Sequence, residues 1–143
     1  MKKLIALCFV VLAACSLFSF GVKKKDKAAL MGIWMTTKKV GPGVPAGLKI
    51  FEENGTYYNV AFENGKTIMT HKGKYKILSD VNYLEKVTDV RFNAAWDLKD
   101  KEFVNTYALN SDKTQLILAG TVFSKNKKDS LKWEESYQRV QLP

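Results

Sequence analysis

The sequence alternates apolar and polar residues over short segments separated by turn dipeptides, and this pattern constrains the fold more than any other feature. The clearest example is Thr56–Glu63, which lies between Asn54-Gly55 and Asn64-Gly65. Asn-Gly is the dipeptide that most readily adopts the two positive φ angles of a type I′ hairpin turn. Alternation with period two is typical of strands that bury one face. The segment is therefore predicted to be the middle strand of an antiparallel meander.

Segments of this kind recur at roughly ten-residue spacing from Gly32 onward, which is typical of an all-β sandwich or barrel. Sequential hairpins favour an up-and-down antiparallel barrel, because a Greek-key sandwich needs long connections between non-adjacent strands. We predict a barrel of about eight or nine strands, with at most a short helical turn near 27–31. The expected strands begin at Gly32 and cover Leu48–Glu52, Thr56–Glu63, Lys66–His71, Lys74–Leu78, Tyr83–Asp89, Arg91–Leu98, Phe103–Leu109, Gln115–Phe123 and Leu131–Gln141.

Residues 1–15 have the organisation of a secretion signal. Lys2 and Lys3 precede an apolar segment, 4–11, that is too short to cross a bilayer as a helix. Leu12-Ala13-Ala14-Cys15 has the pattern of a lipoprotein cleavage box, which predicts that Cys15 becomes a lipid-bearing N-terminus in the cell envelope. The alternative is ordinary cleavage near Gly21, after the small residues of Ser19-Phe20-Gly21, which would release a soluble periplasmic or secreted protein.

The remaining chain is predicted to contain a basic tether, 16–31, and one barrel domain, 32–143. Without Lys2 and Lys3, the 23 Lys and Arg fall to 21 against 14 Asp and Glu, a formal charge of +7. Export and the lack of a nucleic-acid-binding motif argue against a nucleic-acid partner. The only cysteines are Cys8 and Cys15, so the domain has no disulfide and must be stabilised by packing.

The two ends of the domain carry a pattern with a structural meaning. Gly32-Ile33-Trp34 opens the first expected strand, and Glu135-Ser136-Tyr137-Gln138-Arg139-Val140 closes the last. This pattern resembles the lipocalin and wider calycin group, and more narrowly the lipocalin-like domains of unknown function in secreted proteins and lipoprotein precursors of Gram-negative gut bacteria. The resemblance covers 32–140. It implies that Gly32, Trp34 and Arg139 close one end of the barrel, with the guanidinium stacked on the indole.

Period-two alternation also predicts which side chains face the barrel interior. The last strand places Trp133, Glu135 and Arg139 on one face, so we expect Glu135 to point inward and to form an ion pair with Arg139 or Arg91. A ligand contact is the alternative role for Glu135. The candidate ligand-lining residues are Tyr58, Val60, Phe62, Phe92, Trp96, Tyr107, Trp133 and Glu135. The same residues could instead form a filled core, because eight-stranded barrels are often just wide enough to be packed by their own side chains.

No catalytic or metal-binding pattern is present, so we expect neither an enzyme nor a cofactor. His71 is the only histidine, it has no ligand-like spacing to other residues, and we interpret it as a surface strand residue. Two functional hypotheses follow. The barrel binds a small apolar or amphipathic molecule in the cell envelope, or it has a filled core and acts through its surface as an interaction or assembly domain. The sequence does not indicate an oligomeric state.

Overall fold

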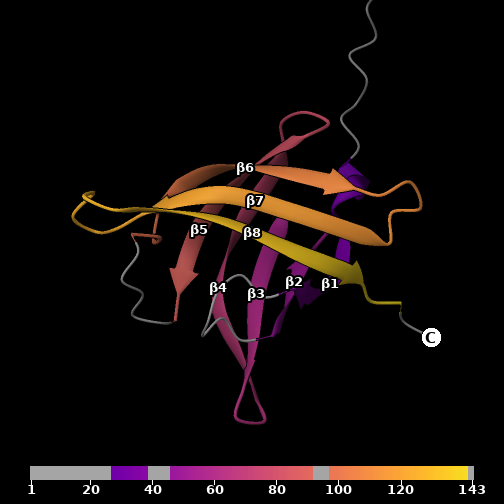
Figure 1. The fold of residues 1–143 in the computed structure, drawn as a ribbon, viewed down its shortest axis with the longest axis horizontal. Helices are drawn as coiled ribbons and strands as arrows, with labels where there is room; N and C mark the ends of the chain where they lie inside the picture. The colour runs from indigo at the N-terminus through magenta and orange to yellow at the C-terminus, as the bar shows by residue number, and fades with distance from the viewer. Residues whose placement is uncertain (1–26, 39–45, 92–96, 142–143) are drawn as a thin grey trace, which may run out of the picture.

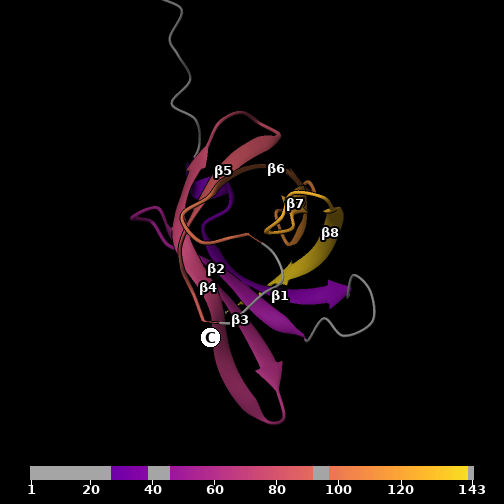
Figure 2. The ribbon, with the colours of Figure 1, turned by 90° about the vertical axis from the view of Figure 1, so that its left-hand side faces the viewer.

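The computed structural model describes residues 27–38, 46–91 and 97–141, and it confirms the all-β prediction. Eight antiparallel strands form a closed barrel in chain order, and pairing of β1 with β8 closes it. Figure 1 shows β6, β7 and β8 crossing in front of β3 and β4, and Figure 2 shows the strands curling around a common interior. The strands are β1 (Gly32–Lys38), β2 (Gly47–Phe51), β3 (Thr56–Glu63), β4 (Lys66–Ile77), β5 (Asn82–Val90), β6 (Glu102–Leu109), β7 (Gln115–Phe123) and β8 (Ser130–Arg139), after a short 3-10 helix η1 (Lys27–Ala29).

The two Asn-Gly dipeptides adopt different turns. At Asn64-Gly65 both residues have positive φ angles, 51° and 71°, as a type I′ hairpin requires. At Asn54-Gly55 only the glycine has a positive φ, 79°, and the loop spans the four residues between β2 and β3. There the Asn54 side-chain oxygen accepts a hydrogen bond from the Thr56 amide at 2.8 Å. The prediction of a type I′ turn is therefore confirmed at the second dipeptide and wrong at the first.

The prediction that Gly73 separates two strands is wrong, because β4 continues through it as one strand of twelve residues. A Cβ atom on Gly73 would lie 1.9 Å from the backbone oxygen of Lys86 on β5. The glycine therefore permits close approach of two strands and does not end one. The pairing shifts register at Thr70 on β4 and again at Thr88 on β5, so two bulges lie close to this contact, one in each strand pair that β4 forms.

The segment Arg91–Leu98, predicted to be a strand, lies largely outside the described residues. The described residues of this segment are Arg91, Asp97 and Leu98, and none of them belongs to a strand. The chain is described again from Asp97, and the Asp97 amide donates to the Phe123 carbonyl at 3.0 Å before β6 begins. The connection between β5 and β6 is thus anchored to the end of β7.

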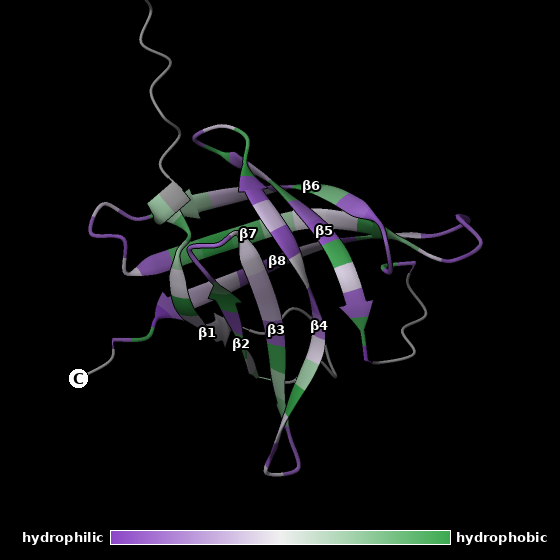
Figure 3. Cartoon of the chain, turned by 180° about the vertical axis from the view of Figure 1, so that it is seen from behind, coloured by the Kyte–Doolittle hydropathy of each residue, from purple (hydrophilic) through white to green (hydrophobic). Residues whose placement is uncertain are grey.

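We call the end of the barrel where β1 begins and β8 ends the closed end. Apolar and polar residues alternate along the strands (Figure 3), and the inward residues near the closed end form one hydrophobic cluster. This half of the barrel is packed by its own side chains, as the filled-core alternative requires. Its members are Leu30, Trp34, Phe51, Tyr57, Ile77, Tyr83, Tyr107, Leu116, Leu118 and Tyr137.

Candidate functional site

The structure brings Gly32, Trp34 and Arg139 together at the closed end. Trp34 is fully buried, and its indole nitrogen donates to the Leu30 carbonyl at 2.7 Å. The Arg139 guanidinium lies 4.2 Å from the centre of a Trp34 ring and donates to the Met31 carbonyl at 2.8 Å. Gly32 has a φ of +134°, and a Cβ there would lie 2.6 Å from a guanidinium nitrogen. The glycine, the stacked cation and the buried indole thus form one closure that carries no chemistry of its own.

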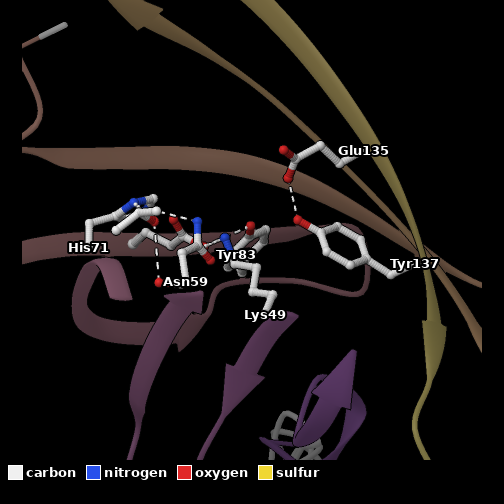
Figure 4. Close-up of polar contacts among 8 residues, drawn as sticks. Lys49, Asn59, His71, Tyr83, Glu135 and Tyr137 are labelled. Atoms are coloured by element: carbon white, nitrogen blue, oxygen red, sulfur yellow. Dashed lines mark hydrogen bonds and ion pairs between the residues drawn. The ribbon is translucent and has the colours of Figure 1, made fainter. Parts of the chain in front are cut away.

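Beyond the hydrophobic cluster, the interior contains a buried ion pair that sequence reasoning missed. The Lys49 ammonium on β2 lies 2.5 Å from the Glu85 carboxylate on β5, and the two side chains are 2% and 6% exposed. Tyr83 donates to the same carboxylate at 3.0 Å (Figure 4). The rings of Phe51, Tyr57 and Trp133 lie 5.6, 5.1 and 6.0 Å from the ammonium. Aromatic faces on several sides and one carboxylate thus compensate the charge that burial would otherwise penalise.

The side chains of Lys49, Glu85, Tyr83, Asn59 and His71 form a layer of buried polar groups, which we call the polar layer. The interpretation of His71 as a surface residue is therefore wrong. Its Nε2 lies 2.8 Å from the Asn59 amide nitrogen, and its Nδ1 lies 3.2 Å from the Thr70 hydroxyl, which donates to the Asn59 carbonyl (Figure 4). This network assigns the proton to Nδ1. Burial, followed by the nearby positive charge of Lys49, lowers the pKa of His71 to about 4. The imidazole is therefore neutral at physiological pH.

The lowered pKa of His71 predicts a loss of stability in mild acid. The unfolded chain binds a proton on this histidine near its usual pKa of 6.5, whereas the folded protein does so only near 4. Stability is thus undiminished above pH 6.5 and falls as the pH drops towards 4. We expect the free energy of unfolding to decrease by about 2 kcal/mol between pH 7 and 5. Urea unfolding across this range checks it, and in His71→Gln the decrease should largely disappear.

Three buried tyrosines surround the polar layer and remain protonated. Burial, followed by the charge of Glu85, raises the pKa values of Tyr57 and Tyr83, and burial together with Glu135 raises that of Tyr137. The phenols of Tyr83 and Tyr137 therefore donate hydrogen bonds at neutral pH, to Glu85 and Glu135. Tyr137 donates to Glu135 (Figure 4), which corrects the expected ion pair of Glu135. The Arg139 guanidinium is instead stacked on Trp34 and donates to the Lys113 and Met31 carbonyls.

The predicted ligand-lining residues divide into three groups. Tyr107 is buried in the hydrophobic cluster, and Trp133 and Glu135 lie on the inner face of β8. The residues expected on β3 lie on its outer face, because the buried face of that strand carries Tyr57, Asn59 and Ala61. Phe62, for instance, is 41% exposed. The prediction that Tyr58, Val60 and Phe62 line the interior is therefore wrong. Phe92 and Trp96 lie outside the described residues.

A groove of about 750 Å³ opens to solvent between β6 and β7, where these two strands separate. Its inner wall includes Phe103 and Trp133, and its outer part includes Val104 and Phe123, which are 62% and 51% exposed. Trp133 also faces the Lys49 ammonium, so the groove reaches the edge of the buried polar layer. The lining residues are Glu102, Phe103, Val104, Thr106, Ala119, Gly120, Thr121, Phe123, Lys132, Trp133 and Glu134.

The sequence does contain a signal for the missed polar residues. Glu85 has Tyr83 and Val87 two positions away on either side, so period two places the carboxylate on an otherwise apolar face. Lys49 stands in the same relation to Phe51. A charged residue at such a position either pairs across the interior or neutralises, and the structure shows that these two pair.

Within the described ranges, no group of three or more His, Cys, Asp and Glu residues is arranged to hold a metal ion. None of the helices among the described residues has the length and hydropathy needed to cross a membrane.

Comparison with known proteins supplies the family. No curated protein matches the chain in sequence. The family model described as "Domain of unknown function (DUF4488)" matches residues 29–143, the region that contains all eight strands, the Trp34–Arg139 closure, the buried ion pair and the groove. Because the match covers most of the chain, this protein belongs to the DUF4488 family.

Proposed function

We propose that this protein is an exported, lipid-anchored lipocalin-like barrel that binds a small amphipathic molecule in the cell envelope and acts without catalysis. The observation that carries the proposal is the groove between β6 and β7, an aromatic-lined hollow that borders a buried polar layer. Ligand sites are typically concave, largely apolar and about 300–1,000 Å³ in volume, with a few convergent polar groups. At about 750 Å³, the groove has the dimensions of such a site.

Aromatic side chains give the groove an apolar contact surface on both sides of the barrel wall. Phe103 and Trp133 come from the inner faces of β6 and β8, and Phe123 comes from the end of β7. An apolar body held against these rings would leave a polar group close to the buried layer, which an amphipathic ligand requires. Removal of apolar area from water contributes about 25 cal/mol per Å².

Native mass spectrometry of the protein purified from its own host would reveal a co-purifying molecule, and titration with fatty alcohols, isoprenoids and fatty acids would reveal saturable binding. Trp133→Ala is expected to weaken binding of any ligand found by about 1–3 kcal/mol, because one apolar wall is lost. Ile117→Ala is a suitable control, since Ile117 is 44% exposed and lies outside the groove lining. Absence of saturable binding across the panel would contradict the proposal.

The proposed anchor rests on the cleavage box at Leu12-Ala13-Ala14-Cys15. Each buried methylene of an acyl chain contributes about 0.8 kcal/mol, so several chains on Cys15 would hold the protein firmly at a membrane. Cys15→Ala is expected to abolish lipidation and membrane attachment, which fractionation and mass spectrometry of the N-terminus check. Wild-type protein that is soluble and begins near Val22 would show that ordinary signal cleavage occurs instead.

A second candidate function is interaction with another envelope protein through the surface of β6 and β7. Val104 and Ile117 are 62% and 44% exposed on the outer faces of these strands. Large aliphatic side chains exposed on neighbouring strands can contribute to an interaction surface. This function would be favoured if the ligand panel gives no saturable binding and Val104→Ser abolishes a complex that cross-linking captures in cells.

A further inference from the structure

The groove is bounded by a local separation of the barrel wall. Pairing of β6 with β7 runs from Leu109↔Leu116 to Thr106↔Ala119 and stops there. In the described part of the chain, 102–105 pair with β5, and 120–123 pair with β8. The hydrogen bond from the Asp97 amide to the Phe123 carbonyl then bridges the rim. The result is an opening in the side of the barrel, bounded by these strand pairings. Its lining includes both inward and outward residues of the two strands.

Asn105 lies directly beneath this opening. It is 2% exposed, while the residues on either side of it, Val104 and Thr106, line the groove. Its Oδ1 atom has no hydrogen-bond partner among the described residues. The Asn105 side chain also lies next to the Tyr83 phenol, where it opposes the rise in the pKa of that group. A buried carbonyl oxygen is thus left as an acceptor without a donor, which is unfavourable unless a donor is supplied.

Gly120 makes room for this arrangement. A Cβ atom at Gly120 would lie 2.2 Å from Asn105 Oδ1 and 2.9 Å from the Trp133 ring. Gly120 and Trp133 both line the groove, so the Asn105 carbonyl lies directly behind the floor of the groove, against the glycine. One unpaired acceptor thus lies behind the glycine and beside one aromatic ring.

Charge around the floor does not favour an anion. The Lys49 ammonium is already paired with Glu85, Glu135 adds a carboxylate held by Tyr137, and His71 is neutral at physiological pH. At the rim, Glu134 accompanies Lys132, and Glu102 lies 3.3 Å from the Lys86 ammonium. Neither floor nor rim therefore presents an excess of positive charge.

We propose that the groove between β6 and β7 selects ligands with an uncharged hydrogen-bond donor, such as an alcohol, phenol or amide, and that Asn105 Oδ1 is the acceptor that recognises it. The apolar body of the ligand lies against Phe103 and Trp133. This inference rests on the proposed function, because it names the ligand class of the same site. Asn105 is then a specificity-determining residue, and Gly120 positions it.

Three matched aromatic probes test the donor requirement by isothermal titration calorimetry at pH 7. They are 2-naphthol, which has a neutral donor, 2-methoxynaphthalene, which has none, and 2-naphthoate, which is an anion. A site built around a buried acceptor discriminates against an analogue that leaves it unpaired, so 2-naphthol is expected to bind about tenfold more tightly than 2-methoxynaphthalene. 2-Naphthoate is expected to bind more weakly than 2-naphthol.

The variant Asn105→Leu should remove the preference for 2-naphthol while leaving the affinity for 2-methoxynaphthalene the same or higher. Asn82→Leu is the matched control, because Asn82 alternates with inward Tyr83 and faces outward on β5, and it should retain the preference. Circular dichroism and thermal unfolding establish that each variant is folded. The comparison of probes on the wild type tests the proposal even if Asn105→Leu does not fold.

The outcomes separate this inference from the proposed function. Equal affinity of the wild type for all three probes would leave binding in the groove intact and overturn recognition by Asn105. Tightest binding of 2-naphthoate would overturn the donor requirement in the same way. Failure of all three probes and of the wider ligand panel to saturate would overturn the proposed function together with this inference.

Discussion

Replacement of Trp34 by Ala is expected to lower the free energy of unfolding by about 3–5 kcal/mol, because a fully buried aromatic side chain is removed from the closed end. The change also removes the indole donor to the Leu30 carbonyl and the ring on which the Arg139 guanidinium stacks. The cavity cannot collapse easily, since β1, β8 and the segment before β1 all pack around this ring. Equilibrium unfolding in guanidinium chloride measures the loss.

Met35→Ala provides the control for Trp34→Ala. Met35 is the next residue on β1, its side chain is 47% exposed, and its truncation should cost less than about 1 kcal/mol. If the two variants were equally stable, the closure at Trp34 would not be a main source of stability in this barrel.

Removal of one partner of the buried ion pair is the second change with a large expected effect. Lys49→Met should lower the free energy of unfolding by about 3–5 kcal/mol, because it leaves the Glu85 carboxylate buried without a counter-charge. The double variant Lys49→Met/Glu85→Gln should recover at least half of this loss, since glutamine is neutral and can still accept from Tyr83. Urea unfolding of both variants measures the difference.

The exposed ion pair between Lys86 and Glu102 supplies the matched control. Its charges lie 3.3 Å apart, but the side chains are 53% and 54% exposed, so Lys86→Met should change stability by less than about 1 kcal/mol. A double variant no more stable than Lys49→Met would show that the cost arises from lost packing and not from the unpaired carboxylate.

These predictions distinguish two halves of the barrel interior, one apolar and one polar. The closed half is an apolar core whose aromatic rings exclude water, and it holds the strands in place. The other half contains charged and polar groups that an apolar core of the same volume would not need. A buried ion pair is weak support for stability in itself, because the cost of removing its charges from water offsets their attraction. The ammonium of this pair lies 6.0 Å from the Trp133 ring, which lines the groove.

The contact between Trp34 and Arg139 at the closed end could be predicted because the first residue lies on the first strand and the second lies on the last. An up-and-down barrel pairs its first and last strands, so Trp34 and Arg139 become neighbours once the strand order is known. The groove could not be predicted in the same way. Nothing in the sequence of β6 or β7 marks Thr106 and Ala119 as the last pair, because strand separation depends on the curvature of the whole sheet. The close approach of Asn105 to Gly120 likewise depends on that curvature.

The inner face of β3 illustrates the same limit. Tyr58, Val60 and Phe62 form its more apolar face and were expected to point inward, yet Tyr57, Asn59 and Ala61 do so. Pairing with β2 sets this choice, because Phe51 and Lys49 lie opposite Tyr57 and Asn59 on the inner side. A shift of one residue in register exchanges the two faces of a strand.

The sequence by itself therefore determined the features that depend on neighbouring residues: strands with period two, turns at Gly and Asn, and an all-β barrel of about eight strands. Only the tertiary structure decided which face of each strand is buried, that Lys49 on β2 meets Glu85 on β5, and where β6 and β7 separate. The physical reason is that register and barrel closure are set by interactions between segments far apart in the chain. Local propensity and alternation carry no information about those distances.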